Sequence, residues 1–232
     1  MKYHRLKKFK IHFLVVAVLF FIPNIALAQL STILPDGLGI ELGIGHNQLF
    51  WQAEDIDETT IRANRTALSI MPSARIHYTI SVTADAGLYT FFGYNEFGGR
   101  SKESQHTAFT NADVLYKDRF RFQNLEAGII GLYRISHVNV GLGAKANYHL
   151  NISQRHHFQN HPQGQDGWGS SDVDFFFKDW SIDGGIRIEY LVTNGISLGG
   201  EGWFGLSDLS DVDDISMDIR QNHFRFLLGY RF

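Results

Sequence analysis

Residues Val138 to Ile152 read VNVGLGAKANYHLNI, and apolar residues occupy every second position of this stretch. The positions between them hold asparagine, glycine, lysine or histidine. A period of two puts successive side chains on opposite faces of a β-strand, whereas a helix repeats every ~3.6 residues. The stretch therefore predicts a strand with one apolar face and one polar face.

Seven further stretches follow the same alternation less strictly. They lie near residues 37–50, 67–80, 82–94, 121–135, 179–192, 195–207 and 221–232. Most are longer than the roughly 9 to 11 residues that a tilted strand needs to cross a bilayer. Pro72 has no amide hydrogen to donate, so it predicts a bulge or a local break in the stretch 67–80.

The connections between these eight predicted strands alternate strictly in length. A few residues separate the second strand from the third, the fourth from the fifth and the sixth from the seventh. The other connections are long and polar, and they cover about 51–66, 95–120, 153–178 and 208–220. With both chain ends on the short-turn side, this arrangement predicts an all-β fold, an eight-stranded antiparallel closed transmembrane β-barrel.

A shared signature ends four of the predicted strands. It pairs a tyrosine with an apolar residue two positions later: Tyr78-x-Ile80, Tyr133-x-Ile135, Tyr190-x-Val192 and Tyr230-x-Phe232. The two residues of a pair share one face of a strand. Since tyrosine favours the boundary between hydrocarbon and water, we expect a membrane girdle of Tyr78, Tyr133, Tyr190 and Tyr230.

The first 28 residues have the three parts of a secretory signal peptide. Basic residues crowd positions 2–10, an apolar run extends from Ile11 to Ile22, and the small-residue pattern Ala26-Leu27-Ala28 follows. A single membrane anchor is the alternative, but the apolar run is short for that and Pro23 interrupts it. We expect cleavage after Ala28, which leaves residues 29–232 as the barrel domain.

Charge and cysteine content exclude several functions. The chain has a formal net charge of −3, and cleavage after Ala28 would remove five basic residues and no acidic one, which leaves −8. Such a surface excludes nucleic acid as a partner. The chain has no cysteine, which excludes disulfide bonds, thiol catalysis and cysteine-ligated zinc.

The polar faces of the predicted strands are rich in glycine and charge. We expect ten charged residues to face the lumen: Glu41, Arg75, Asp85, Glu126, Lys145, Asp183, Arg187, Glu189, Glu201 and Arg225. An unpaired charge in a confined interior is costly, so these acids and bases should pair and plug the lumen. An ion pathway is the functional alternative. A soluble barrel of the lipocalin type, which is apolar inside and polar outside, fits this pattern poorly.

The last strand runs Phe224-x-Phe226-x-Leu228-x-Tyr230-x-Phe232. It resembles the terminal strand of bacterial outer-membrane barrels, in which alternating apolar residues and a final Phe are read by the barrel-assembly machinery. With the eight-strand plan, residues 29–232 resemble the outer-membrane β-barrel domain family of small OmpA/OmpX-type barrels, and the tyrosine-ended strands resemble its PorT-like members. The resemblance implies location in the outer membrane of a Gram-negative cell envelope, with membrane lipid and the assembly machinery as partners.

Three groups of loop residues are candidates for binding. His156, His157 and His161 offer imidazoles to zinc or copper, although no carboxylate stands at a matching spacing. Aspartates without EF-hand spacing crowd the last long connection: Asp208, Asp211, Asp213, Asp214 and Asp218. Aromatic residues gather in and next to the third long connection, residues 153–178: Trp168, Phe175, Phe176, Phe177 and Trp180. Polar exposed loops explain the first two groups more simply, and we expect no cofactor.

These features favour a structural or surface-interaction protein that acts through its extracellular loops on an extracellular or envelope partner. Loop 153–178 combines polar groups with aromatic anchors and is the main candidate. A secretion-associated accessory role, as implied by the PorT-like resemblance, is one alternative. A lipid-modifying enzyme is another, with Ser170, Ser171 and Asp172 beside the loop histidines as formal candidates. We assign no catalytic residue.

Overall fold

The computed structural model describes residues 37–53, 69–100, 104–106, 114–159, 167–193, 195–211 and 217–232. The strands are β1 Gly37–Ala53, β2 Ser69–Ser81, β3 Ala86–Arg100, β4 Ser104–His106, β5 Val114–Ile135, β6 Val138–Gln159, β7 Gly167–Asp172, β8 Trp180–Thr193, β9 Ile196–Gly205 and β10 Met217–Arg231, and a 3-10 helix η1 covers Asp174–Phe176. Within these ranges no helix has the length and apolarity to cross a membrane. The predicted signal peptide, residues 1–28, lies outside them.

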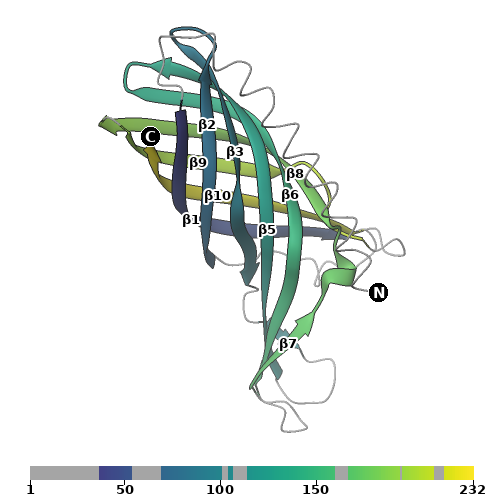
Figure 1. The fold of residues 1–232 in the computed structure, drawn as a ribbon. Helices are drawn as coiled ribbons and strands as arrows, with labels where there is room; N and C mark the ends of the chain where they lie inside the picture. Colours follow the sequence, from purple (N-terminus) through teal and green to yellow (C-terminus); the bar gives the residue numbers. More distant parts are fainter. Residues whose placement is uncertain are drawn as a thin grey trace.

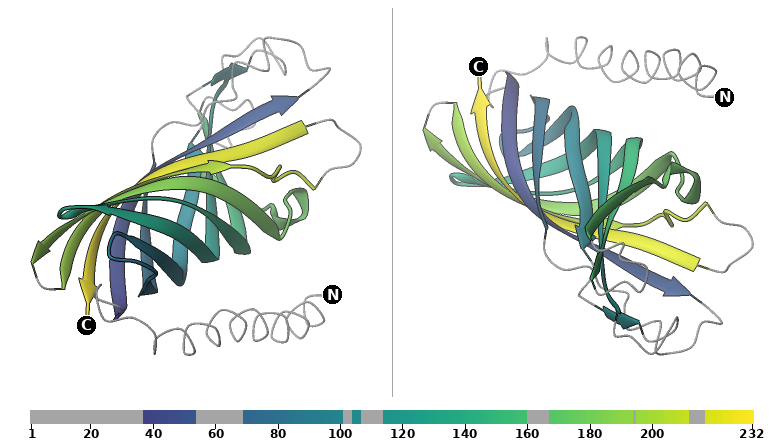
Figure 2. Two further views of the ribbon diagram at one scale, coloured as in Figure 1. Left: turned by 90° about the horizontal axis from the view of Figure 1, so that it is seen from above. Right: turned by 90° about the horizontal axis from the view of Figure 1, so that it is seen from below.

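The strands form a closed antiparallel ring. Their order is β4-β5-β3-β2-β1-β10-β9-β8-β6-β7, and an additional pairing of β5 with β6 closes the sheet on itself. The ring therefore contains β1, β2, β3, β5, β6, β8, β9 and β10, while β4 and β7 are attached outside it (Figure 1). The C-terminal strand lies beside the first strand in both views of Figure 2. The prediction of an eight-stranded closed barrel is confirmed.

The two ends of the barrel differ. At the short-turn end, β2 joins β3, β5 joins β6 and β8 joins β9 through tight connections. At the opposite end, called the loop end, the strands reach farther than predicted. β5 and β6 stay paired as far as Leu115 and Gln159, so much of the predicted loop 153–178 and the end of loop 95–120 are strand. In Figure 1, β5, β6 and β7 project beyond the other strands.

Pro72 does not produce the predicted bulge. It pairs with Ile44 of β1 in a register that runs without a shift from Ser69 to Thr79. The ladder between β2 and β3 instead begins at Ser73. A proline disrupts a sheet only where a neighbouring strand would accept its amide hydrogen. At Pro72, β2 is paired with β1 but not with β3, so the proline is tolerated there.

A bulge occurs at a place that the alternation does not indicate. Gln123 of β5 pairs with Asn151 of β6, but Asn124 pairs with His149, so Leu150 is an extra residue. An extra residue reverses the side-chain alternation beyond it. Ile152, which the alternation places on the outer apolar face, is therefore buried inside the barrel.

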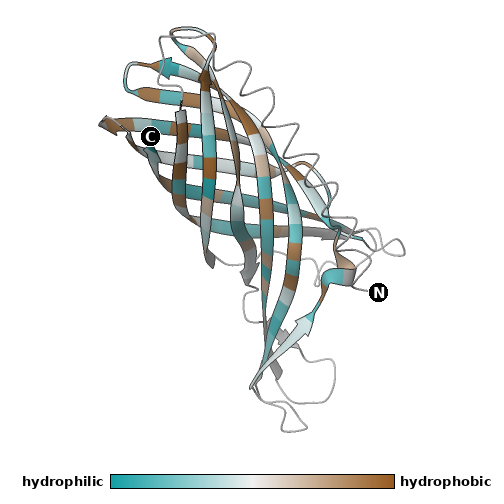
Figure 3. Ribbon diagram, in the orientation of Figure 1, coloured by the Kyte–Doolittle hydropathy of each residue, from teal (hydrophilic) through white to brown (hydrophobic). Residues whose placement is uncertain are grey.

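The outer surface of the barrel is apolar and the inner surface is polar. Large apolar side chains stand exposed on every ring strand but β3, as with Leu142 at 70% and Phe226 at 76% exposure. Figure 3 shows the alternation of hydrophobic and hydrophilic residues along the strands. A contiguous apolar surface of this extent is not stable in water, and it matches the surface that a membrane barrel presents to lipid.

The predicted girdle lies near the short-turn end. Tyr133, Tyr190 and Tyr230 are exposed together with their apolar partners, whereas Tyr78 is half-buried. Ile80, expected to share the outer face with Tyr78, is buried. The tyrosine signature therefore predicts an exposed pair correctly on three of the four strands that carry it.

Closure of the ring should appear as resistance to detergent. With all eight ring strands paired on both sides, no edge is open to attack, so the protein should stay folded in SDS at room temperature. We expect a shift in gel mobility only after boiling. Identical migration of heated and unheated samples would contradict the closed barrel.

Candidate functional site

The lumen contains a buried network of charged side chains. All of the predicted lumen charges except Asp85 are buried: Glu41, Arg75, Glu126, Lys145, Asp183, Arg187, Glu189, Glu201 and Arg225. Asp85 lies exposed in the turn before β3, so its assignment to the lumen is wrong. The reason is that β3 begins at Ala86, later than the alternation suggests.

Strand register places opposite charges side by side. Glu41 of β1 is the cross-strand partner of Arg75 of β2. Glu201 of β9 lies between Arg187 of β8 and Arg225 of β10. Directly opposed charges of opposite sign stabilise a strand pair, and here they do so on the inward face.

The first half of the network is built around two arginines. Arg75 donates from Nε to Glu41 at 2.6 Å and from Nη1 and Nη2 to the two carboxylate oxygens of Glu201 at 3.0 and 2.5 Å. Arg187 donates to Glu201 at 2.7 Å and to Glu189 at 3.0 Å, and it also pairs with Glu41. Such forked, charge-assisted bonds offset the cost of removing the ions from water.

The second half is built around Glu126. Arg225 donates to both of its carboxylate oxygens at 2.7 Å, and Lys145 Nζ donates at 2.8 Å. Lys145 also lies 3.5 Å from Asp183. A 4.0 Å contact between Arg75 and Glu126 joins the two halves into one network across the lumen.

Aromatic side chains fill the space between these charges, which sequence reasoning missed. Tyr89 donates its hydroxyl to Glu41 at 2.7 Å, and the guanidinium of Arg187 lies 4.4 Å from its ring centroid. Trp203 donates to Glu201 at 2.8 Å. Gly185 makes room for it, since a Cβ there would lie 2.4 Å from the indole ring. Alternation in the sequence could have shown this, because Tyr89 stands two residues after Gly87. Both residues therefore lie on the face of the strand that was expected to line the lumen.

An apolar cluster closes the lumen toward the loop end. It comprises Leu49, Phe97, Phe120, Phe122, Ile152, Val173, Phe177, Leu209 and Ile219. The rings of Phe97 and Phe122 stack at 4.7 Å, and Phe177 meets Phe122 edge-on at 5.0 Å. Phe177 therefore belongs to this cap, while Phe176 is exposed. We call the nine residues the apolar cap.

Asp208 binds backbone groups next to the apolar cap. Its carboxylate accepts the backbone N–H groups of Ser210 at 2.9 Å and Ile219 at 2.8 Å, and Lys178 donates at 3.2 Å. Partial burial raises the pKa of the Asp208 carboxyl, but these backbone and lysine hydrogen bonds outweigh it and hold the pKa below its usual value. The aspartate thus fastens the chain between β9 and β10.

The candidate histidines separate. His156 and His157 are consecutive on β6, so they point to opposite faces of the sheet. The ring of His157 lies against Trp168 at 4.8 Å. His161 is outside the described residues. Within the ranges that the structure describes, no group of three or more histidine, aspartate or glutamate side chains is placed to hold a metal ion.

The formal catalytic candidates lie on one edge strand. Ser170, Ser171 and Asp172 belong to β7 and face Arg155, Gln154 and Ser153 of β6. Because side chains alternate along a strand, Ser170 and Asp172 share one face of β7, and Ser171 points to the other. His77 lies buried in the lumen and stacks on Tyr89 at 4.8 Å.

The closed ring, the apolar exterior and the interior of buried, paired polar side chains define a membrane β-barrel. No protein-family model matches the sequence, and no curated protein matches it significantly. Solved structures do match. They include Ail, the attachment invasion locus protein of Yersinia pestis, at 15% identity over 86% of this chain and 100% of that chain, with a TM-score of 0.42. Neisserial surface protein A matches at 13% identity over 84% and 97% of the two chains, with a TM-score of 0.42. The outer membrane protease OmpT from Escherichia coli matches at 12% identity over 87% and 99%, with a TM-score of 0.39. The PorT-like resemblance stays a prediction.

Proposed function

We propose that the protein is a non-conducting barrel of the bacterial outer membrane, exported through a signal peptide of residues 1–28, which acts through its surface outside the bilayer. The filled lumen supports the first part. An eight-stranded barrel has an interior just wide enough for side chains, and here paired ions, Tyr89, Trp203 and the apolar cap occupy it.

The C-terminal strand supports insertion by the barrel-assembly machinery. The residues of the predicted assembly signal all stand exposed on the outer face of β10 and at the chain end: Phe224, Phe226, Leu228, Tyr230 and Phe232. An alternating apolar strand beside the closing seam is accessible to a receptor before the ring closes.

The observation that carries a surface role is the projection at the loop end. β5 and β6 are 22 residues long, whereas crossing a bilayer takes roughly 9 to 11. Beyond the ring they form a four-stranded sheet in the order β4-β5-β6-β7. Outer-membrane barrels have short periplasmic turns, so in the proposed orientation this sheet is outside the cell, where structure beyond the needs of the barrel serves recognition.

Shortening the sheet tests this function. Gln154 and Ser171 are cross-strand partners, so residues 155–170 can be replaced by a two-residue Asn-Gly turn that closes a hairpin at that pair. The variant should keep its heat-dependent gel shift, because the ring strands are intact, and should fail to restore the phenotype of a strain that lacks the protein.

Two results would contradict the proposal. Full restoration by the folded variant would remove the surface role. Reproducible single-channel steps from the wild-type protein in planar bilayers would replace the filled lumen with a pore. Among the described residues, no specific contact favours a lipid-modifying enzyme or a secretion-associated accessory protein over this function.

A further inference from the structure

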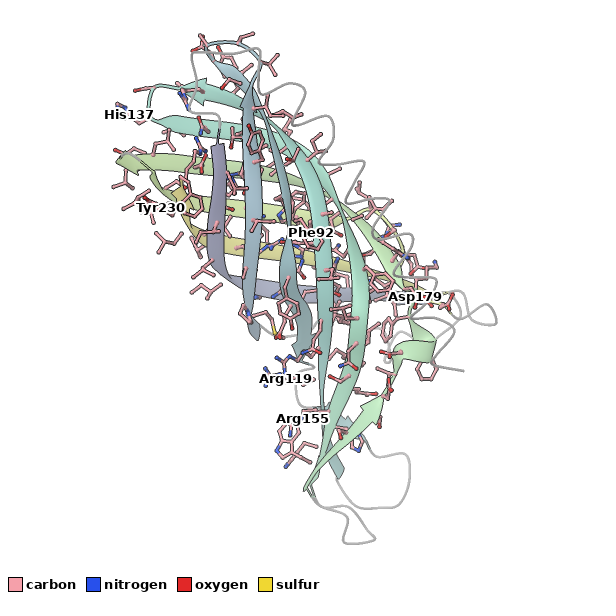
Figure 4. All side chains as sticks on the ribbon, in the orientation of Figure 1. Phe92, Arg119, His137, Arg155, Asp179 and Tyr230 are labelled. Atoms are coloured by element: carbon pink, nitrogen blue, oxygen red, sulfur yellow. The ribbon has the colours of Figure 1, made fainter. Side chains whose placement is uncertain are left out.

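Two arginines face each other across the projecting sheet. Arg119 of β5 and Arg155 of β6 are direct cross-strand partners, and both side chains are exposed. Figure 4 shows them close together at the projecting end, far from Tyr230 and His137 at the short-turn end. The backbone of Arg100 in β3 is in turn the partner of Arg119. We call Arg119 and Arg155 the arginine row.

Like charges in direct opposition destabilise a strand pair, so Arg119 and Arg155 repel each other where they stand. Other exposed cations have carboxylate partners: Arg121 with Glu96 at 2.6 Å, Lys178 with Asp208 at 3.2 Å and Arg220 with Asp218 at 2.8 Å. In the part of the chain that the structure describes, no carboxylate pairs with Arg119 or Arg155. An anion from outside would supply what the row lacks.

The row continues the lipid-facing surface. On β5, Tyr133, Ile129 and Arg119 share the outer face by alternation. On β6, the extra residue Leu150 reverses the alternation, so that Arg155 also points outward rather than over the lumen. Without that bulge the two arginines would lie on opposite sides of the sheet. The row is therefore directed sideways, toward the molecules that surround the barrel in the membrane plane.

The arginine row lies too far along the barrel to be within the hydrocarbon layer of the membrane. Tyr148 and Trp180 form an outer aromatic pair at 4.7 Å, and Tyr148 is the cross-strand partner of Leu125. Arg119 lies about 20 Å farther along β5 at about 3.3 Å per residue. With a strand tilt of roughly 40°, this puts the row about 15 Å above the aromatic pair. Phospholipid headgroups occupy only about 5 to 8 Å on each side, so the row stands where sugars of a glycolipid would be.

Trp168 adds an apolar platform beside the row. It stands on β7 with 57% of its surface exposed. The guanidinium of Arg155 lies 5.9 Å from its ring centroid, and His157 lies against the same ring. An exposed indole next to paired guanidinium groups presents a flat apolar face and several forked donors together, a combination suited to a phosphorylated sugar.

We propose that the arginine row binds phosphate groups of the phosphorylated glycolipid in the outer leaflet around the barrel, with Trp168 against an adjoining sugar ring. The proposal rests on the proposed outer-membrane function and names the partner of its projecting sheet. Guanidinium groups bind phosphate through two parallel hydrogen bonds, and the backbones of neighbouring strands lie about 5 Å apart, so two cross-strand arginines can reach one phosphate.

The test uses the full-length protein in detergent micelles and purified lipopolysaccharide as the probe. We expect the double variant Arg119→Gln/Arg155→Gln to bind lipopolysaccharide at least about tenfold more weakly than the wild type, because charge-assisted hydrogen bonds to phosphate are lost. The matched control is Arg220→Gln, an exposed arginine with its own carboxylate partner, which should bind like the wild type. All variants should keep the heat-dependent gel shift.

Two further arms identify the ligand. Enzymatically dephosphorylated lipopolysaccharide should bind the wild type as weakly as intact lipopolysaccharide binds the double variant. Heparin should not compete with lipopolysaccharide at equal charge concentration. Equal binding by wild type and double variant, or effective competition by heparin, would overturn the proposal. If the double variant binds normally while the shortened sheet still abolishes the cellular phenotype, only this inference fails and the surface function stands.

Discussion

Replacing Arg187 with methionine lowers the free energy of unfolding by about 3 to 5 kcal/mol, the expected cost of breaking a buried ion pair by removing one partner. Arg187 is fully buried and binds Glu41, Glu189 and Glu201 at once. Methionine keeps most of the volume but none of the charge, so three carboxylates in the lumen lose a shared cation. Among the described residues, the ion pairs that remain to these carboxylates come from Arg75 and Arg231.

Urea titration of the protein folded in micelles measures this effect. The control is Arg220→Met, since Arg220 pairs with Asp218 where both side chains are partly exposed to solvent. That pair should contribute less than about 1 kcal/mol. If the two substitutions cost the same, the lumen is hydrated enough to screen its charges, and the filled interior would have to be abandoned.

Trp203→Ala is expected to cost a similar amount for a different reason. The side chain is 0% exposed, packs against Phe91 at 6.0 Å and donates to Glu201. Truncating a buried tryptophan costs about 3 to 5 kcal/mol, because apolar contacts are lost and the walls of a closed barrel cannot collapse into the space. The orphaned lone pair of Glu201 adds to the loss.

Trp168→Ala is the matched control for this change. Trp168 stands outside the ring and is mostly exposed, so its removal should change the unfolding free energy by no more than about 0.5 kcal/mol. Urea midpoints of the two variants in the same micelles give the comparison. A Trp203→Ala protein as stable as Trp168→Ala would mean that the lumen repacks or fills with water at little cost.

The apolar outer surface and the inward direction of the lumen charges could be predicted from the sequence, because both depend only on the alternation of side chains along a strand. Glu41 and Arg187 face inward for the same reason that Leu42 and Ile186 face outward. Partner choice could not be predicted, since it depends on the register between strands. Glu41 meets Arg187 across the barrel, from a strand far away in sequence, and only closure brings them together.

Alternation also fails wherever one residue is added or a strand starts late. Leu150 reverses the pattern and turns Ile152 inward and Arg155 outward, although nothing in the run VNVGLGAKANYHLNI marks the change. Asp85 fell in a turn for the second reason. The arginine row depends on both the bulge and the pairing of β5 with β6. The alternation within single strands therefore could not predict it.

The seam between β1 and β10 imposes an order on assembly. These strands pair from Gly39 with Arg231 to Ala53 with Met217, and the amide of Phe232 donates to the carbonyl of Leu38. The outer edge of β1, the first strand of the ring, is therefore paired only when β10, the last strand of the ring, is in place. Contacts so distant in sequence form slowly. Until then the partly folded ring has two open strand edges, and open edges favour aggregation.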